Sequence, residues 1–216
     1  RGVIGGEVKR IAGTGVKIRY GTRIGRDVSL KELRRDHDAV LIGIGAHLSR
    51  SPRMEGEDEN PSGYIPGVEF LRDLNLLHHR GEFPKPEGSR VVVVGGGNVA
   101  MDCARSARRL GYTDVRVIYR RTEKEMPADE EEIEAAKEEG VQLDFLTNPV
   151  KLHHQDGRVT GLTCVRMELG EPDPSGRRRP VVIDGSEFQL DCDIVIPAIG
   201  QSTDLSMLEN DFPLET

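Results

Sequence analysis

Four consecutive valines, residues 91–94, run directly into three glycines, residues 95–97. β-Branched residues favour strands, and an uninterrupted apolar run is typical of a strand that is buried on both faces. The glycines fit a tight strand-to-helix turn of the pattern Gly95-x-Gly97-x-x-Ala100. In this pattern the first glycine permits the sharp turn, the second lets a ligand approach the backbone, and the third position must be small so that helix and strand pack.

The start of the helix that follows this turn is expected to bind an anion. Backbone amides in a first helical turn have no partner inside the helix, and the helix dipole favours negative charge there. The turn therefore predicts a dinucleotide site, with a turn that serves only close packing as the alternative. The residues predicted to form the site are Gly95, Gly96, Gly97, Asn98, Val99 and Ala100.

The end of the next expected strand, over 114–121, carries Arg120 and Arg121. Enzymes that use NAD place an acidic residue there to hold the ribose 2′-hydroxyl, whereas guanidinium groups pair with the 2′-phosphate of NADP. Lys124 adds a positive charge, while Glu123 and Glu125 weaken the field. The sequence therefore favours NADP(H) over NAD(H); the alternative is that the arginines only solvate the end of a strand.

Strands and helices alternate through the middle of the chain. We expect strands over 90–95, 114–121 and 141–147, and helices over 98–110 and 128–140. This alternation predicts a parallel sheet with right-handed crossovers. From about residue 150, shorter strands around Asp156-Gly157 predict an antiparallel β-meander, with an exposed loop over 170–180, before a buried strand over 192–201 returns to the sheet. The fold class is therefore α/β, a Rossmann-like parallel sheet with an inserted meander.

The first 88 residues have a different pattern. Helical spacing predicts helices over 3–12, 30–37 and 67–81. Alternation over 15–25 and an apolar run over 38–47 predict two strands, the second of them buried, and residues 49–67 are expected to form a loop. Two prolines make 82–88 a linker.

Composition excludes several classes of function. A net charge of −7 argues against a general nucleic-acid surface, and no apolar run is long enough to cross a membrane. Three isolated cysteines without a CxxC pair favour a reducing compartment, for which we expect the cytoplasm, and argue against a disulfide reductase. None of the four tyrosines begins the Tyr-x-x-x-Lys pattern of a short-chain dehydrogenase. We predict no metal site and no side chain that acts as a catalytic acid or base.

Four stretches, residues 91–111, 117–128, 138–141 and 194–201, together resemble the NADPH-binding domain of the glutamate synthase small (beta) subunit family. Its relatives include the electron-input half of dihydropyrimidine dehydrogenase and the larger subunit of NADH-dependent ferredoxin:NADP oxidoreductases. In that family the NADPH domain is inserted between two halves of an FAD domain. The resemblance implies part of the first FAD half over 1–84, the NADPH domain over 85–200, and the start of the return into the FAD domain over 201–216.

The resemblance also implies further site residues and a function. It implies that Ala198, Ile199 and Gly200 lie beside the nicotinamide and that Gly45 and Ala46 lie near the flavin. The implied function is to pass hydride from NADPH to FAD, for onward transfer to iron–sulfur clusters or a second flavin on a partner subunit or domain. The alternatives are a nucleotide-binding module without turnover and an NADH-linked member of the same flavin family.

The family's FAD fingerprint, its later Gly-Asp motif and its iron–sulfur cysteine segment are not found in this sequence. The sequence begins with Arg1 rather than Met. We therefore expect an excised piece of a longer protein that does not hold FAD tightly.

Overall fold

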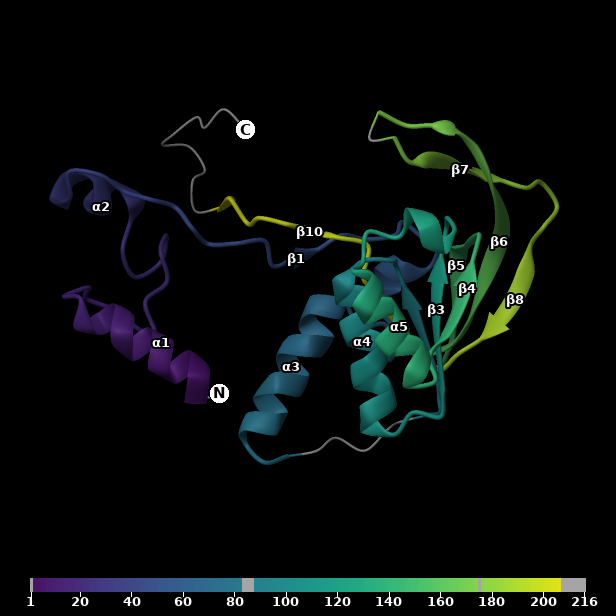
Figure 1. The fold of residues 1–216 in the computed structure, drawn as a ribbon, viewed down its shortest axis with the longest axis horizontal. Helices are drawn as coiled ribbons and strands as arrows, with labels where there is room; N and C mark the ends of the chain where they lie inside the picture. The colour runs from purple at the N-terminus through teal and green to yellow at the C-terminus, as the bar shows by residue number, and fades with distance from the viewer. Residues whose placement is uncertain (1, 83–87, 175, 207–216) are drawn as a thin grey trace. The chain divides into compact units, whose positions relative to one another are not determined.

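The computed structural model describes residues 2–82, 88–174 and 176–206 of the 216-residue chain (Figure 1). These residues form two compact units. One holds the described residues up to Gly45 together with those from Thr203, and the other is Ala46–Ser202. The functional boundaries expected at residues 84 and 200 remain a prediction.

The first unit contains two helices, α1 (Gly2–Gly13) and α2 (Leu30–Asp36). α2 begins with a capping box, in which the Ser29 hydroxyl accepts a hydrogen bond from the Glu32 amide at 3.1 Å and the Glu32 carboxylate accepts one from the Ser29 amide at 2.9 Å. A capping box satisfies two of the amides that a helix start leaves unpaired. Both helices lie where helical spacing predicts them.

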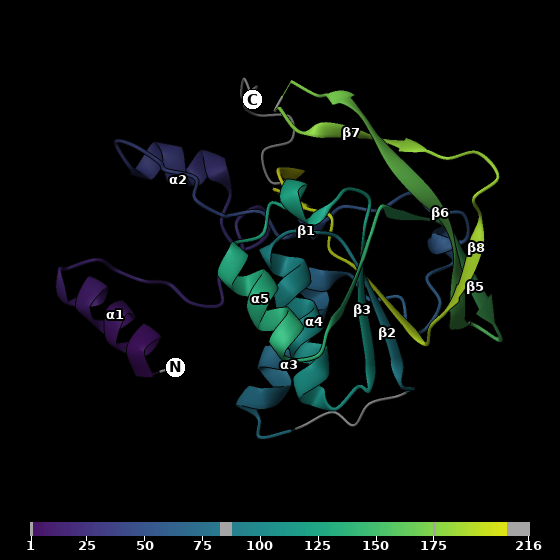
Figure 2. The ribbon, with the colours of Figure 1, turned by 45° about the vertical axis from the view of Figure 1, so that its right-hand side comes forward.

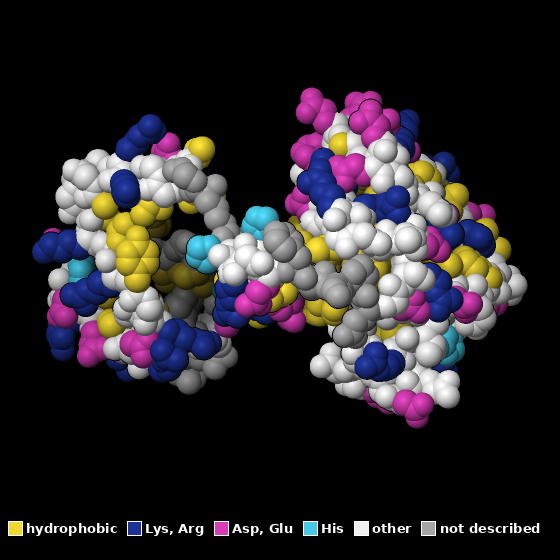
Figure 3. Space-filling model, turned by 90° about the horizontal axis from the view of Figure 1, so that it is seen from below, with side chains coloured by type: hydrophobic (Ala, Val, Ile, Leu, Met, Phe, Trp, Pro, Cys, Tyr) yellow, Lys and Arg dark blue, Asp and Glu magenta, His cyan; other side chains and the backbone are white. Residues whose placement is uncertain are grey.

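The two strands predicted in this unit do not form. Residues 15–25 contain only turns and an isolated bridge between Ile24 and Val28, and residues 38–47 contain no strand. The predicted burial of 38–47 is also wrong, because Leu41 is 96% exposed. A strand requires a hydrogen-bonded neighbour, and no described residue pairs with either segment along a ladder. Figure 3 shows hydrophobic side chains among charged ones at the surface.

The second unit is built on a parallel sheet of four strands in the order β4-β3-β2-β9. Its strands are β2 (Arg90–Val94), β3 (Asp114–Tyr119), β4 (Gln142–Phe145) and β9 (Ile194–Pro197). β9 pairs with β2, so the last strand of the sheet returns beside the first, as predicted. The valines of β2 lie at the centre, with Val92 opposite Arg116 on one side and Val195 on the other.

Three helices cover one face of this sheet: α3 (Gly67–His79), α4 (Asn98–Leu110) and α5 (Glu130–Glu138) (Figure 2). Val91 and Val93 pack with α4 in one core cluster, while Val92 and Val94 pack in a second cluster on the opposite face. All four valines are therefore buried, which explains why the run shows no polar alternation. α4 and α5 are each followed by a glycine with positive φ, 98° at Gly111 and 81° at Gly140, a conformation that commonly ends a helix.

The opposite face is covered by the antiparallel meander. Its strands are β5 (Thr147–Gln155), β6 (Arg158–Pro172), β7 (Arg178–Val182) and β8 (Phe188–Asp191). The Asp156-Gly157 turn joins β5 to β6 with positive φ at both residues, 51° and 72°, which is the geometry that a two-residue hairpin prefers. The predicted α/β class with an inserted meander is confirmed. The loop expected over 170–180 is shorter, because β6 and β7 extend into it.

The remaining elements of this unit are short. β1 (Leu48–Ser49) pairs with β10 (Gln201–Ser202) in an antiparallel ladder, and single helical turns lie at η1 (Glu57–Glu59) and η2 (Glu123–Glu125). Part of the expected linker, residues 83–87, lies outside the described residues. No helix in the described part of the chain is both long and apolar enough to cross a bilayer.

Candidate dinucleotide-binding site

A cavity of about 440 Å³ lies in the second unit, at the carboxyl ends of the parallel strands. In open α/β sheets ligands bind at this edge. Ten of the fourteen predicted site residues line the cavity: Gly95, Gly96, Gly97, Asn98, Val99, Arg120, Arg121, Ala198, Ile199 and Gly200. The other four, Ala100, Lys124, Gly45 and Ala46, do not line it.

The first two glycines of the turn are required by the protein's own packing. A Cβ atom on Gly95, where φ is 149°, would lie 2.3 Å from the carbonyl oxygen of Ala198. A Cβ atom on Gly96 would lie 2.6 Å from Cε2 of Tyr119. Neither position has room for a side chain, because real Cβ atoms do not approach other atoms so closely.

Gly97 differs from its two neighbours. Its φ is −100°, which any residue adopts, and a Cβ atom built on it would meet only Cγ of Pro127, at 3.8 Å. The protein therefore does not need glycine at this position for packing or for backbone conformation. The missing side chain leaves open space on the cavity side of the turn, which fits the close approach of a ligand to the backbone.

The N-terminus of α4 has no side-chain cap. Gly97 is the N-cap residue, and the side chain of Asn98 bonds to Asp129 instead: the Asn98 amide donates to the Asp129 carboxylate at 2.9 Å, and the Asp129 backbone N–H donates to Asn98 Oδ1 at 2.9 Å. Asn98 thus ties the start of α5 to the glycine turn. The first backbone N–H groups of α4 meet no capping side chain at the cavity, which suits an anion.

Ala100 supports the turn from behind. It is fully buried, and its Cβ atom is 3.5 Å from the position of a Cβ built on Gly95. A larger side chain at residue 100 would push α4 away from β2. This is the packing role that the third position of the pattern predicts.

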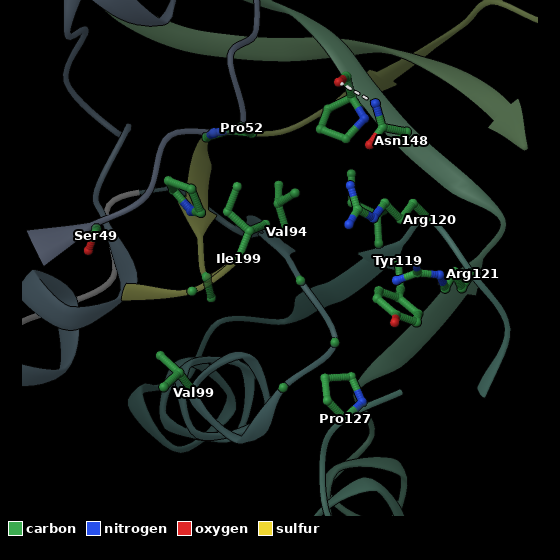
Figure 4. A pocket seen from close by; sticks show the side chains of 18 of the residues that line it. Ser49, Pro52, Val94, Val99, Tyr119, Arg120, Arg121, Pro127, Asn148 and Ile199 are labelled. Carbon is green, nitrogen blue, oxygen red and sulfur yellow. Dashed lines mark hydrogen bonds between the residues drawn. The ribbon is translucent and has the colours of Figure 1, made fainter. Parts of the chain in front are cut away.

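The two arginines at the end of β3 lie in different environments. Arg120 is exposed, and Figure 4 shows its side chain at the cavity, on the same side as Tyr119 and Pro127. The Arg121 side chain is only 6% exposed. It donates to the Asp173 carboxylate at 2.9 Å and to the carbonyl oxygen of Arg178 at 2.7 Å. The carboxylate and carbonyl partners of Arg121 therefore distinguish it from its exposed neighbour.

A third arginine lines the cavity, and the sequence did not predict it. Arg177 comes from the turn between β6 and β7, within the segment expected to be only an exposed loop. Its signal in the sequence was the run Arg177-Arg178-Arg179, which by itself indicates nothing more than a charged surface. Lys124 is exposed in η2 and does not line the cavity.

The charge of the cavity is opposite in sign to that of the whole chain. Its described lining residues include three arginines and no Asp or Glu, although the chain carries a net charge of −7. Asp173 offsets the charge of Arg121. Together with the amides of α4, these side chains make the cavity suited to a ligand with several phosphates.

The other end of the cavity is formed by residues that follow β9. Ile199 is 41% exposed, Gly200 has a φ of 125°, and the Gly200 carbonyl accepts a hydrogen bond from the Arg50 amide at 3.0 Å. Figure 4 shows Ile199 and Ser49 across the cavity from Arg120. Gly45 and Ala46 are exposed, and their contact with a flavin remains a prediction.

All three cysteines of the chain are buried and unpaired. Burial raises the pKa of each thiol, Cys103, Cys164 and Cys192, to about 12. The thiolate is the reactive form, so none of them is suited to disulfide exchange. Within the described residues, no group of three or more His, Cys, Asp or Glu side chains forms a metal site.

Comparison with known proteins agrees with this geometry. A family model described as pyridine nucleotide-disulphide oxidoreductase matches residues 3–216. The chain is 54% identical over 209 residues to the NADP(+)-dependent formate dehydrogenase subunit beta of Moorella thermoacetica, covering 97% of this chain and 29% of the relative. It is 47% identical over 211 residues to the NADPH-Fe(3+) oxidoreductase subunit beta of Geobacter sulfurreducens, covering 97% and 31%.

The glutamate synthase [NADPH] small chain of Escherichia coli is 40% identical over 195 residues, covering 87% of this chain and 41% of the relative. The chain thus spans less than half the length of these relatives. Among solved structures, Mycobacterium tuberculosis FprA in complex with NADPH shares the fold, with a TM-score of 0.68 at 22% identity, covering 83% of this chain and 54% of that one. The predicted relationship to glutamate synthase small chains is confirmed, and the chain belongs to the pyridine nucleotide-disulphide oxidoreductase family.

Proposed function

We propose that this chain is the NADPH-binding part of a flavin oxidoreductase in which hydride passes from NADPH to FAD. The observation that carries the proposal is the cavity itself, in which arginines and the uncapped start of α4 face a space free of acidic side chains among the described lining residues. The relatives named above support it, because their names specify NADP(+) or NADPH.

Each part of the cavity has a role in this proposal. The backbone amides of Gly97, Asn98 and Val99 hold the pyrophosphate, with Gly95, Gly96 and Ala100 setting the turn. Arg120 binds the 2′-phosphate, and Lys124 adds a weaker field from outside the cavity. Ala198, Ile199 and Gly200 border the nicotinamide, and Gly45 and Ala46 approach the flavin.

The hydride chemistry belongs to the nicotinamide and the flavin, and the protein's part is to bind and orient them. No Asp, Glu, His, Lys or Cys is found among the described residues that line the cavity, so the chain offers no strong proton donor or base there. The buried cysteines argue against electron transfer through a disulfide. Direct transfer between two cofactors needs neither group.

Electrons then leave the flavin for a partner subunit or domain that carries iron–sulfur clusters or a second flavin. This part of the proposal rests on the relatives, two of which are named as beta subunits and one as a small chain. We also propose that the protein works in the cytoplasm, because its three cysteines are unpaired.

Titration of the purified 216-residue chain with NADPH and with NADH tests the proposal. We expect the chain to bind NADPH more tightly than NADH. Arg120→Gln should lower the affinity for NADPH about tenfold and leave the affinity for NADH unchanged, because one charge-assisted contact to the 2′-phosphate is lost. Arg72→Gln, which removes an exposed arginine from α3, is the matched control. Equal affinity for both nucleotides would indicate an NADH-linked enzyme or a general nucleotide site, and no binding of either by the folded chain would contradict the proposal.

A further inference from the structure

The buried ion pair between Arg121 and Asp173 joins two parts of the fold. Arg121 lies two residues beyond the end of β3, and Asp173 lies 52 residues further on, between β6 and β7. The Asp173 side chain is 19% exposed, so both partners are largely withdrawn from water. The pair therefore fixes Asp173, just beyond β6, at the carboxyl edge of the parallel sheet, beside the cavity.

The same carboxylate also orders the turn itself. One oxygen of Asp173 accepts from the Arg121 guanidinium at 2.9 Å, and the other accepts from the Arg177 backbone N–H at 3.3 Å. The Asp173 amide donates in return to the Arg177 carbonyl at 2.7 Å. The backbone of Arg177 is thereby held against Asp173, the residue that pairs with Arg121.

The three successive arginines of this hairpin have three different placements. Arg177 lines the cavity. The Arg178 side chain is directed back along β6, where its guanidinium donates to the carbonyl oxygens of Leu169 and Gly170. Arg179 is exposed and does not line the cavity. Of the three arginines, Arg177 is therefore the one that lines the cavity.

We propose that Arg177 is a second residue that binds the 2′-phosphate of the nucleotide, together with Arg120, and that Arg121 and Asp173 position it. The inference rests on the proposed NADPH site and deepens it. It gives Arg121 a different task from the one expected from sequence: its guanidinium is committed to Asp173, so it acts through the hairpin rather than on the phosphate. Two guanidinium groups are suited to hold a phosphate dianion between them.

The experiment compares adenosine 2′,5′-bisphosphate with adenosine 5′-monophosphate, which differ only in the 2′-phosphate, by calorimetric titration of the 216-residue chain. We expect Arg177→Gln to lower the affinity for the bisphosphate about tenfold and to leave the affinity for the monophosphate unchanged. Arg177→Lys keeps the charge but not the fork of donors, and should recover part of the loss. Arg179→Gln removes the same charge from the same hairpin and should change neither affinity.

Asp173→Asn tests the positioning role. We expect it to lower the affinity for the bisphosphate in the wild-type background. In the Arg177→Gln background it should have no further effect, since Asp173 acts through Arg177. A merely structural role of Asp173 would lower the affinity for both ligands in both backgrounds. Circular dichroism of each variant confirms that the chain remains folded.

The outcomes separate this inference from the proposed function. If Arg120→Gln abolishes the preference for the bisphosphate while Arg177→Gln behaves like Arg179→Gln, the role of Arg177 is refuted and the NADPH site stands. If Arg177→Gln weakens both ligands equally, the inference is also refuted, because the effect is not specific to the 2′-phosphate. If the folded wild-type chain binds neither ligand, the proposed function itself fails.

Discussion

The three glycines that follow β2 are adjacent in sequence, but each has a different reason to be glycine. A side chain at Gly95 would collide with the backbone of Ala198, and one at Gly96 would collide with the ring of Tyr119. Gly97 has neither constraint. The folded chain alone therefore explains two of the three glycines, and the third fits the proposed approach of a ligand to the backbone.

Gly97→Ala separates folding from binding. We expect the free energy of unfolding to fall by less than about 1 kcal/mol, because the added methyl group meets only Pro127 at an ordinary distance. Binding of NADPH should weaken more than tenfold, because the methyl group occupies the space of the pyrophosphate. Urea unfolding and NADPH titration of the same sample measure the two effects.

Gly95→Ala is the matched control, since it adds the same methyl group two residues earlier. It should lower the free energy of unfolding by more than about 3 kcal/mol, because the methyl group would overlap a backbone oxygen. If Gly97→Ala binds NADPH as well as the wild type does, the glycine turn does not hold the pyrophosphate.

At the same scale, the difference between Arg120 and Arg121 could not be read from sequence. Both are arginines at a strand end, and both were expected to bind the phosphate. The partner that withdraws Arg121 is Asp173, which is far away in the chain and is brought close only by the meander. A side chain's task is decided by its partners, and partners distant in sequence are visible only in the fold.

At the level of elements, the sequence predicts best where local signals mark both ends. The helix expected over 98–110 forms with those bounds, because a glycine turn begins it and Gly111 ends it. The strand expected over 15–25 does not form, although Val16, Ile18 and Tyr20 alternate with polar residues. Alternation describes a surface that a strand could present, but a neighbouring strand must supply the hydrogen bonds.

Asp193 joins two neighbouring strands at their starts. Its carboxylate accepts hydrogen bonds from the Arg90 guanidinium at 2.7 Å and from the backbone N–H groups of Ser89 and Arg90 at 2.8 and 3.0 Å. The guanidinium contact is the largest cause that lowers the pKa of Asp193, from 3.8 to about 2. A pKa that is lower in the folded state stabilises the fold above pH 3.8, and this stabilisation is lost as the pH falls through 2.

Asp193→Asn should therefore reduce the free energy of unfolding by about 1–2 kcal/mol at pH 7 and by much less near pH 2. Urea titrations at both pH values measure the difference. Asp191→Asn is the control, because Asp191 also faces Arg90, at 3.3 Å, but its side chain is 78% exposed. An equal loss in the two variants would show that the general charge near Arg90 matters, rather than the buried contacts of Asp193.

On the scale of the whole molecule, the parallel sheet divides the core into two clusters. Cys103 belongs to the cluster on the helical face, whereas Cys164 and Cys192 belong to the cluster beneath the meander. The division follows from β2, whose successive valines point to opposite faces. Each cluster thus contains at least one natural thiol that reports on its exposure.

We expect none of the three thiols to react with a thiol reagent at pH 8 in the folded chain, because burial raises each pKa to about 12. In urea all three should react with one common rate, since the sheet is shared by both clusters and unfolding of either exposes the other. Mass spectrometry of peptides after timed labelling measures each rate. Faster reaction of Cys103 alone would mean that the helical layer opens separately from the meander.

The position of β9 has a consequence for how the protein is made. Val91 pairs with Ile194, so one edge of β2 is closed by a strand that is synthesised about 100 residues later. At about 5–20 residues per second, a ribosome needs about 5–20 s to cover that distance. Throughout this interval the nascent valine strand has a bare edge, which is where unintended pairing with another chain begins. Within the parallel sheet, the last strand to be translated is thus the one that protects the first.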